Sequence, residues 1–147
     1  MKEPTQQKRI LFVEDDGDLR KVVSDYLEGL GFYVITAARG KCASRMIEKL
    51  PPDLALIDVR LPDMSGLEIC KWVKKEKTLA NVPIIIISGG TGLQDKLKGY
   101  LSGAERYLCK PFDMKDLGME IITLLESTGN KANSLFEDKF SEIRESP

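Results

Sequence analysis

Charged and hydroxyl side chains stand directly at the ends of short apolar runs in this chain. They are Glu14, Asp15 and Asp16 after RILFV, Asp58 after LALI, Ser88 at the end of VPIIIIS, and Lys110 after RYLC. Carboxylates that crowd together repel one another unless a cation neutralises them. Oxygen ligands without histidine or cysteine suit a hard ion such as Mg²⁺, which also binds phosphate oxygens. If the fold brings these residues together, they indicate a magnesium site that handles a phosphoryl group.

The elements that must position these residues alternate regularly along the chain. Apolar runs predict strands at 9–13, 32–37, 54–57, 82–88 and 106–109. Helical periodicity predicts helices that end near Gly31 and that cover about 40–50, 66–76, 93–102 and 114–127. Such alternation is typical of an α/β fold in which a parallel sheet carries helices on both faces. In a doubly wound sheet, ligands bind beyond the carboxyl ends of the strands, where the residues above would lie.

Composition limits the classes of function. With 147 residues, of which 42% are hydrophobic, the chain suits one domain with a short extension. Its 22 basic and 23 acidic residues are balanced, so neither nucleic acid nor a membrane surface is indicated as a direct partner. The absence of histidine excludes histidine triads, histidine metal sites and a phosphohistidine carrier. The polar start and three scattered cysteines predict a cytoplasmic protein with reduced, buried thiols.

Each residue alone also has a structural interpretation. Asp16 can simply cap the first helix, as Glu14 or Asp15 could, Ser88 can be a turn residue, and Lys110 can be a solvated charge. Beyond the last predicted helix, residues 128–147 read as a linker and a possible short amphipathic helix over 134–145, which could support a homodimer.

Four motifs together resemble the receiver domain of two-component response regulators: ILFVEDD, LALIDVRLPDMSG, IIIISG and YLCKPF. The resemblance covers residues 8–127. It implies a flavodoxin-like (CheY-like) sheet of five parallel strands in the order 2-1-3-4-5, an order known for that family.

The resemblance also assigns roles to the residues that match the motifs. Asp58 would be the phosphoacceptor. The metal ion, Mg²⁺ or Mn²⁺, would be held by Glu14, Asp15, Asp58 and the backbone carbonyl of Arg60. Lys110 would contact the phosphoryl group.

Further carried-over roles concern the conformational switch. Ser88 would supply the switch hydroxyl, and Tyr107 would be the aromatic residue that moves between outward and inward positions. The bond between Lys110 and Pro111 would be cis, which only bonds to proline adopt at low cost.

The implied function is a phosphorylation-dependent switch and not an enzyme that acts on other molecules. Because this chain has no histidine, the donor must lie elsewhere, and the resemblance implies a phosphohistidine on a sensor histidine kinase or a phosphotransfer protein. The output would pass to a downstream protein or a fused effector through the face made by the fourth helix, fifth strand and fifth helix.

Two alternatives stay open on the sequence. A magnesium-dependent phosphohydrolase also forms an aspartyl phosphate, but it places the nucleophile in a DxD motif after the first strand, where this chain has adjacent acids. A receiver-like binding module that works without phosphorylation is the second alternative.

Overall fold

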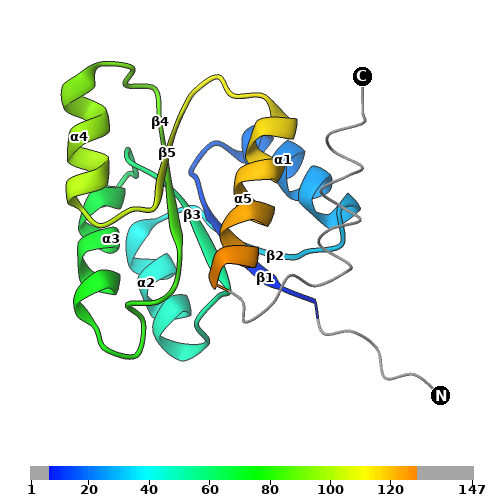
Figure 1. The fold of residues 1–147 in the computed structure, drawn as a ribbon, viewed down its shortest axis with the longest axis horizontal. Helices are drawn as coiled ribbons and strands as arrows, with labels where there is room; N and C mark the ends of the chain where they lie inside the picture. The colour runs from blue at the N-terminus through cyan, green and yellow to red at the C-terminus, as the bar shows by residue number, and fades with distance from the viewer. Residues whose placement is uncertain (1–6, 129–147) are drawn as a thin grey trace.

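A computed structural model describes residues 7–128 of the chain (Figure 1). The tail helix predicted at 134–145 lies outside the described residues. In chain order the elements are β1 (Arg9–Val13), α1 (Gly17–Gly29), β2 (Tyr33–Ala37), α2 (Gly40–Lys49), β3 (Leu54–Asp58), α3 (Gly66–Lys75), β4 (Ile84–Ser88), α4 (Leu93–Leu101), β5 (Arg106–Cys109) and α5 (Met114–Thr128). Within the described residues, each of the five strands and five helices predicted from the sequence is present, with boundaries that differ by a few residues at most.

The five strands form one parallel sheet in the order β2-β1-β3-β4-β5, which confirms the predicted fold class. The register explains why the polar residues meet. Val13 of β1 pairs with Ile57 of β3, so Glu14 and Asp58 follow side by side at the same edge of the sheet. Ser88 pairs with Cys109, which places Lys110 immediately beyond the same edge.

Two hydrophobic clusters cover the two faces of the sheet, because successive side chains of a strand point to opposite sides. Ile10 and Phe12 of β1 pack with α1 and α5, whereas Leu11 and Val13 pack with α2 and α3. Figure 1 shows α1 and α5 on one side of the sheet and α2, α3 and α4 on the other. The sheet is therefore buried on both faces in the region that carries the site.

Strand β4 lies between β3 and β5 and is buried along its whole length. Its isoleucines divide between the two clusters: Ile85 and Ile87 join the α1/α5 side, and Ile84 and Ile86 join the α2/α3 side. A continuous run of β-branched residues is typical of a strand that is covered on both faces. Strand β4 therefore contributes side chains to both hydrophobic clusters.

Helix α4 differs from the sequence prediction in the side that faces the sheet. The helical spacing of Leu93, Leu97 and Leu101 predicts that these residues face inward, yet they are 83%, 54% and 73% exposed. The buried residue of this helix is Gly99. The prediction of buried thiols is wrong for Cys42 on α2, which is exposed. Val22 lies on the apolar stripe that predicts α1, but it is exposed as well.

Candidate functional site

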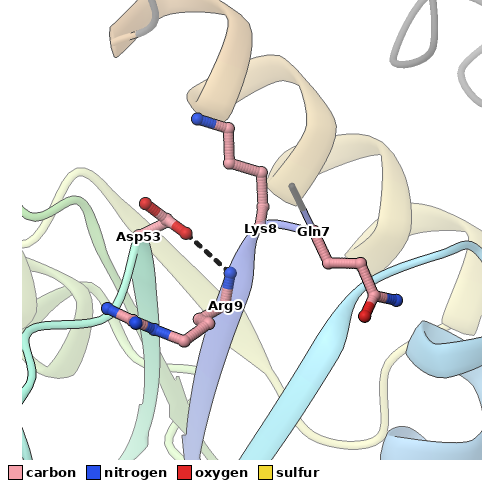
Figure 2. A pocket seen from close by; sticks show the side chains of 4 residues that line it. All are labelled: Gln7, Lys8, Arg9 and Asp53. Atoms are coloured by element: carbon pink, nitrogen blue, oxygen red, sulfur yellow. Dashed lines mark hydrogen bonds between the residues drawn. The ribbon is translucent and has the colours of Figure 1, made fainter. Parts of the chain in front are cut away.

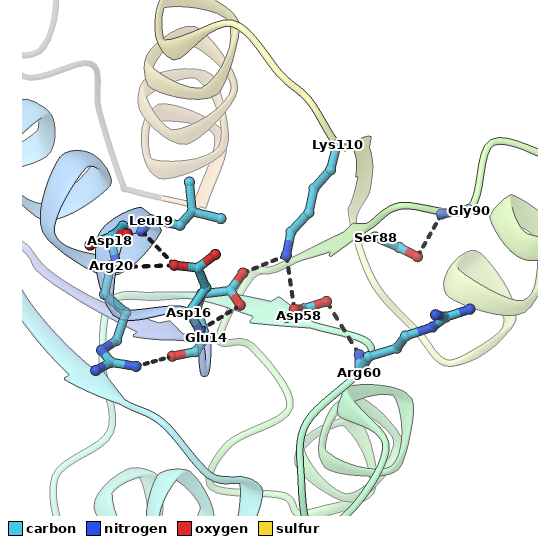
Figure 3. A network of polar contacts seen from close by, with 10 residues as sticks. All are labelled: Glu14, Asp16, Asp18, Leu19, Arg20, Asp58, Arg60, Ser88, Gly90 and Lys110. Carbon is cyan, nitrogen blue, oxygen red and sulfur yellow. Dashed lines mark hydrogen bonds and ion pairs between the residues drawn. The ribbon is translucent and has the colours of Figure 1, made fainter.

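Asp58 closes β3 with its carboxylate held from two sides (Figure 3). The residue is 5% exposed. The backbone N–H of Arg60 donates to its Oδ1 at 3.2 Å, and the Lys110 ammonium donates to its Oδ2 at 2.9 Å. A carboxylate fixed in this way at the end of a buried strand has little freedom to reorient.

Glu14 lies beside Asp58 and is more deeply buried, at 1% exposure. Its Oε1 accepts a hydrogen bond from the Lys110 ammonium at 2.6 Å, and its Oε2 accepts one from the Asp16 N–H at 3.1 Å. Lys110 therefore bridges the two buried carboxylates, as Figure 3 shows. One positive charge serves two negative ones in this arrangement.

Asp15 and Asp16 follow Glu14 but have different roles: Asp15 joins the carboxylate cluster, and Asp16 caps α1. Asp15 is exposed, yet it can place one carboxylate oxygen within 4.8 Å of oxygens of Glu14 and Asp58. Asp16 caps α1, because its Oδ1 accepts the N–H groups of Asp18 and Leu19 at 2.9 and 3.1 Å. The structure thus shows the capping interpretation for Asp16 and groups the other acids into a cluster.

Burial and charge shift the acid–base equilibria of the cluster. Burial raises the pKa of Glu14 above its ordinary value, and the nearby Asp58 charge acts in the same direction, against hydrogen bonds from Lys110 and from the Asp16 N–H. Partial burial alone would lower the pKa of Lys110, but its hydrogen bonds to Glu14 and Asp58 raise the pKa overall. Lys110 is therefore a permanent cation at neutral pH.

The donor set suits a hard divalent cation. Three carboxylates converge without a nitrogen or sulfur ligand in the cluster, and such oxygen-only sets favour Mg²⁺ or Mn²⁺ over softer metals. A second positive charge would also relieve the excess of carboxylates over ammonium groups. The residues present fit the ion, and the contribution of the Arg60 carbonyl stays a prediction.

Ser88 and Tyr107 contact the same backbone residue in the loop after β4. The Ser88 hydroxyl accepts the Gly90 N–H at 3.0 Å, and the Tyr107 hydroxyl donates to the Gly90 carbonyl at 2.7 Å. Ser88 is 8% exposed and lies on the same strand edge as Asp58. Gly90 thus connects the predicted switch hydroxyl to the predicted switch aromatic residue. The bond between Lys110 and Pro111, next to this group, is cis.

Two glycines lie so close to residues of the site that a side chain would not fit, and the sequence did not predict these contacts. A Cβ on Gly66 would lie 2.1 Å from the Asp58 carbonyl oxygen, so the start of α3 can reach β3 only without a side chain. A Cβ on Gly99 would lie 2.5 Å from Cδ2 of Tyr107, so α4 leaves room for the aromatic ring at this point. The first lies inside the motif LPDMSG, whereas no local signal marks the second.

A separate hollow of about 120 Å³ lies at the opposite end of the sheet, between the starts of β1 and β3 (Figure 2). Gln7, Lys8, Arg9 and Asp53 line it. Asp53 accepts the Arg9 N–H at 2.6 Å, and the Arg9 guanidinium donates to the Pro51 carbonyl. These contacts tie the two strands together far from the acidic cluster.

No helix within residues 7–128 combines the length and apolar character needed to cross a membrane.

Comparison with known proteins adds a family to this geometry. A family profile described as "Response regulator receiver domain" matches residues 10–122. The DNA-binding dual master transcriptional regulator RpaA of Synechocystis is 33% identical over 120 residues, which are 82% of this chain and 50% of that protein. The DNA-binding response regulator MtrA of Mycobacterium tuberculosis is 35% identical over 113 residues, 77% of this chain and 48% of that protein. The chain spans about half the length of these relatives.

A solved structure gives the same result for the fold. The CheY-like response regulator receiver domain protein from Methanospirillum hungatei aligns with a TM-score of 0.78 and 31% identity. The alignment covers 84% of this chain and 97% of that one.

Proposed function

Because this chain belongs to the family of response regulator receiver domains, we propose that Asp58 is its phosphoacceptor and that phosphorylation of Asp58 switches an output surface. The observation that carries the proposal is the arrangement of three groups at one sheet edge: the buried Asp58 carboxylate, the Lys110 ammonium at 2.9 Å, and the Glu14–Asp15–Asp58 oxygen cluster.

The chemistry is an in-line displacement at phosphorus. An Asp58 carboxylate oxygen forms the new O–P bond while the bond from phosphorus to the donor's leaving group breaks, and the product is an acyl phosphate. The Arg60 N–H and Lys110 hold the carboxylate so that an oxygen faces the incoming group. Lys110 also places positive charge where negative charge accumulates on the phosphoryl oxygens.

Glu14, Asp15, Asp58 and the Arg60 carbonyl would hold the divalent cation, Mg²⁺ or Mn²⁺. When bound, this ion offsets the repulsion between the attacking carboxylate and the phosphate oxygens. The chain's chemistry ends on its own Asp58, so we propose no reaction on an external substrate.

The switch would begin at Ser88. Phosphorylation adds close to two negative charges and new acceptor oxygens, and the Ser88 hydroxyl can turn from Gly90 to donate to them. Loss of that contact releases the Gly90 N–H. The carbonyl of the same residue accepts the Tyr107 hydroxyl, so a movement of Gly90 also affects Tyr107. Because the Tyr107 ring packs on Gly99, the change reaches α4.

The proposed donor is a sensor histidine kinase or a phosphotransfer protein in the cytoplasm. The proposed output is the α4–β5–α5 face, where α4 exposes Leu93, Leu97, Tyr100 and Leu101 to a downstream protein or a fused effector. The two relatives are described as DNA-binding, but they are about twice as long as the matched region. We therefore propose no direct contact of the receiver itself with nucleic acid.

A short helix over 134–145 and a homodimer that it could support also stay proposals.

The test is incubation with MgCl₂ and acetyl phosphate, followed by intact mass measurement. We expect one labile phosphoryl adduct on the wild type and none on Asp58→Asn. An adduct that persists on Asp58→Asn would place the chemistry elsewhere. Steady turnover of a small phosphate ester by the wild type would favour the phosphohydrolase, and no adduct at all would favour the binding module.

A further inference from the structure

Helix α2 is capped by a residue from a distant loop and not by its own N-cap residue. Arg39 occupies the N-cap position, and its side chain makes no capping hydrogen bond. Instead, the N–H groups of Gly40 and Lys41 donate to Oδ1 and Oδ2 of Asp63 at 2.8 and 2.9 Å. These two hydrogen bonds hold the pKa of Asp63 below its ordinary value, so the carboxylate form predominates at neutral pH.

Asp63 belongs to the loop that follows Asp58, and two backbone contacts close the base of this loop. The Gly66 N–H donates to the Val59 carbonyl at 2.8 Å, and Arg60 forms a β-bridge with Ser65. The Ser65 hydroxyl in turn caps α3 by accepting the Leu67 N–H at 3.1 Å. The β-bridge joins Arg60 to Ser65, which lies two residues after Asp63, so a contact that anchors Asp63 also acts on the Arg60 backbone.

The tip of the loop rests on the first turn of α2. Besides the Asp63 hydrogen bonds, the Met64 side chain packs closely against Gly40. A Cβ on Gly40 would lie 2.3 Å from Cγ of Met64. Two consecutive loop residues thus contact α2. The same loop carries Arg60, whose N–H bonds to the Asp58 carboxylate.

We propose that Asp63 is a positioning residue for phosphoryl transfer. By fixing the tip of the 59–66 loop on α2, it holds the Arg60 backbone beside Asp58. The Arg60 N–H then stays on the Asp58 carboxylate. The Arg60 carbonyl would stay beside the carboxylates that are proposed to hold the cation. The inference rests on the proposed function, because it names a residue that orients the same site from outside.

The test compares Asp63→Ala with two further variants. Asp53→Ala removes another carboxylate that accepts a backbone N–H, at 2.6 Å, but at the opposite end of the sheet. Arg39→Ser combined with Asp63→Ala gives α2 a local cap, because a serine at the N-cap accepts an N–H of the first turn. This double variant repairs the helix without restoring the link to the loop.

Two readouts are needed: amide hydrogen exchange by mass spectrometry, and the MgCl₂ concentration that gives half-maximal adduct formation from acetyl phosphate. For Asp63→Ala we expect faster exchange in peptides covering 40–43 and 60–65. We also expect about a tenfold rise in the half-saturating MgCl₂, the low end for residues that orient metal ligands. Asp53→Ala should change neither.

In the double variant, exchange at 40–43 should recover while exchange at 60–65 and the magnesium requirement stay altered. Full recovery of both would reduce Asp63 to a helix cap and overturn the proposal. Wild-type exchange at 60–65 in Asp63→Ala would overturn it as well. If the wild type forms no adduct, the proposed function fails, and the exchange data still decide whether Asp63 holds the loop.

Discussion

Replacement of Lys110 by methionine tests the electrostatics of the site most directly. The substitution keeps an unbranched side chain only one atom shorter but removes the ammonium that lies 2.6 Å from Glu14 and 2.9 Å from Asp58. The side chains of these two acids are 1% and 7% exposed. Two buried carboxylates would then face each other without a protein cation.

The expected loss follows from the burial of the partners. Removing one partner of a fully buried ion pair costs roughly 3–5 kcal/mol, because the other charge stays buried and unpaired. The Lys110 side chain is 27% exposed, so water reaches the site and screens part of this cost. We expect a decrease of about 2 kcal/mol in the free energy of unfolding at neutral pH, the value for buried pairs reduced for solvent access.

Magnesium and pH should modify this loss in known directions. A bound divalent cation replaces the missing positive charge, so MgCl₂ should recover most of the stability. The folded-state pKa of Glu14 already lies above its unfolded value, and loss of Lys110 raises it further. The folded state then binds the proton more tightly than the unfolded state, so stability increases as the pH falls through that raised pKa. The deficit should therefore be smaller in mild acid than at neutral pH.

The assay is urea unfolding followed by far-UV circular dichroism, with EDTA or with saturating MgCl₂. Lys74→Met is the matched control, since Lys74 pairs with Glu105 at 2.7 Å, away from the acidic cluster. Its loss of stability should not depend on MgCl₂. The reasoning about the shared ammonium is wrong if Lys110→Met is as stable as the wild type in EDTA. It is also wrong if the decrease in its free energy of unfolding depends on neither MgCl₂ nor pH.

Three further substitutions test local features. Gly66→Ala should lower the free energy of unfolding by about 2–3 kcal/mol in urea, because its Cβ would lie 2.1 Å from the Asp58 carbonyl and the backbone must shift. Unchanged stability would mean that this close approach is absent in solution. Gly99→Ala should be destabilising in urea although alanine favours helices by about 1 kcal/mol, and the same change should become neutral or stabilising with Tyr107→Ala, where the ring is gone. Strict additivity of the pair would contradict the contact. Asp16→Ala should cost about 1 kcal/mol in the same assay through loss of the α1 cap, and a change within error would show that another group replaces it.

The fold was predictable because local patterns agree with its topology. Each strand is an apolar run, and the helix after β1 begins at a capping aspartate. The polar residues at the strand ends were likewise recognisable, since a parallel sheet brings such ends to one edge. The strand order itself came from the family resemblance.

What the sequence did not reveal depends on contacts between distant residues. Asp63 caps α2, which begins 23 positions earlier at Gly40. No residue pattern near Gly40 predicts that Asp63 accepts its N–H. The fit of Tyr107 against Gly99 depends on how α4 sits over β5. The leucines of α4 follow helical spacing, but the helix meets the sheet through its glycine, so the apolar pattern pointed to the wrong side.

The uncharged run of isoleucines in β4 has a consequence before the native state is reached. Segments of this kind, rich in β-branched residues, are those by which unfolded chains associate into intermolecular sheets. Native pairing of β4 requires β3 on one side and β5 on the other, and β5 is made from residues more than fifteen positions further along the chain. Until β5 pairs, β4 presents an open edge to which a second molecule can add. Pro83, which cannot donate a backbone hydrogen bond, stands immediately before the run and limits its extension in such aggregates.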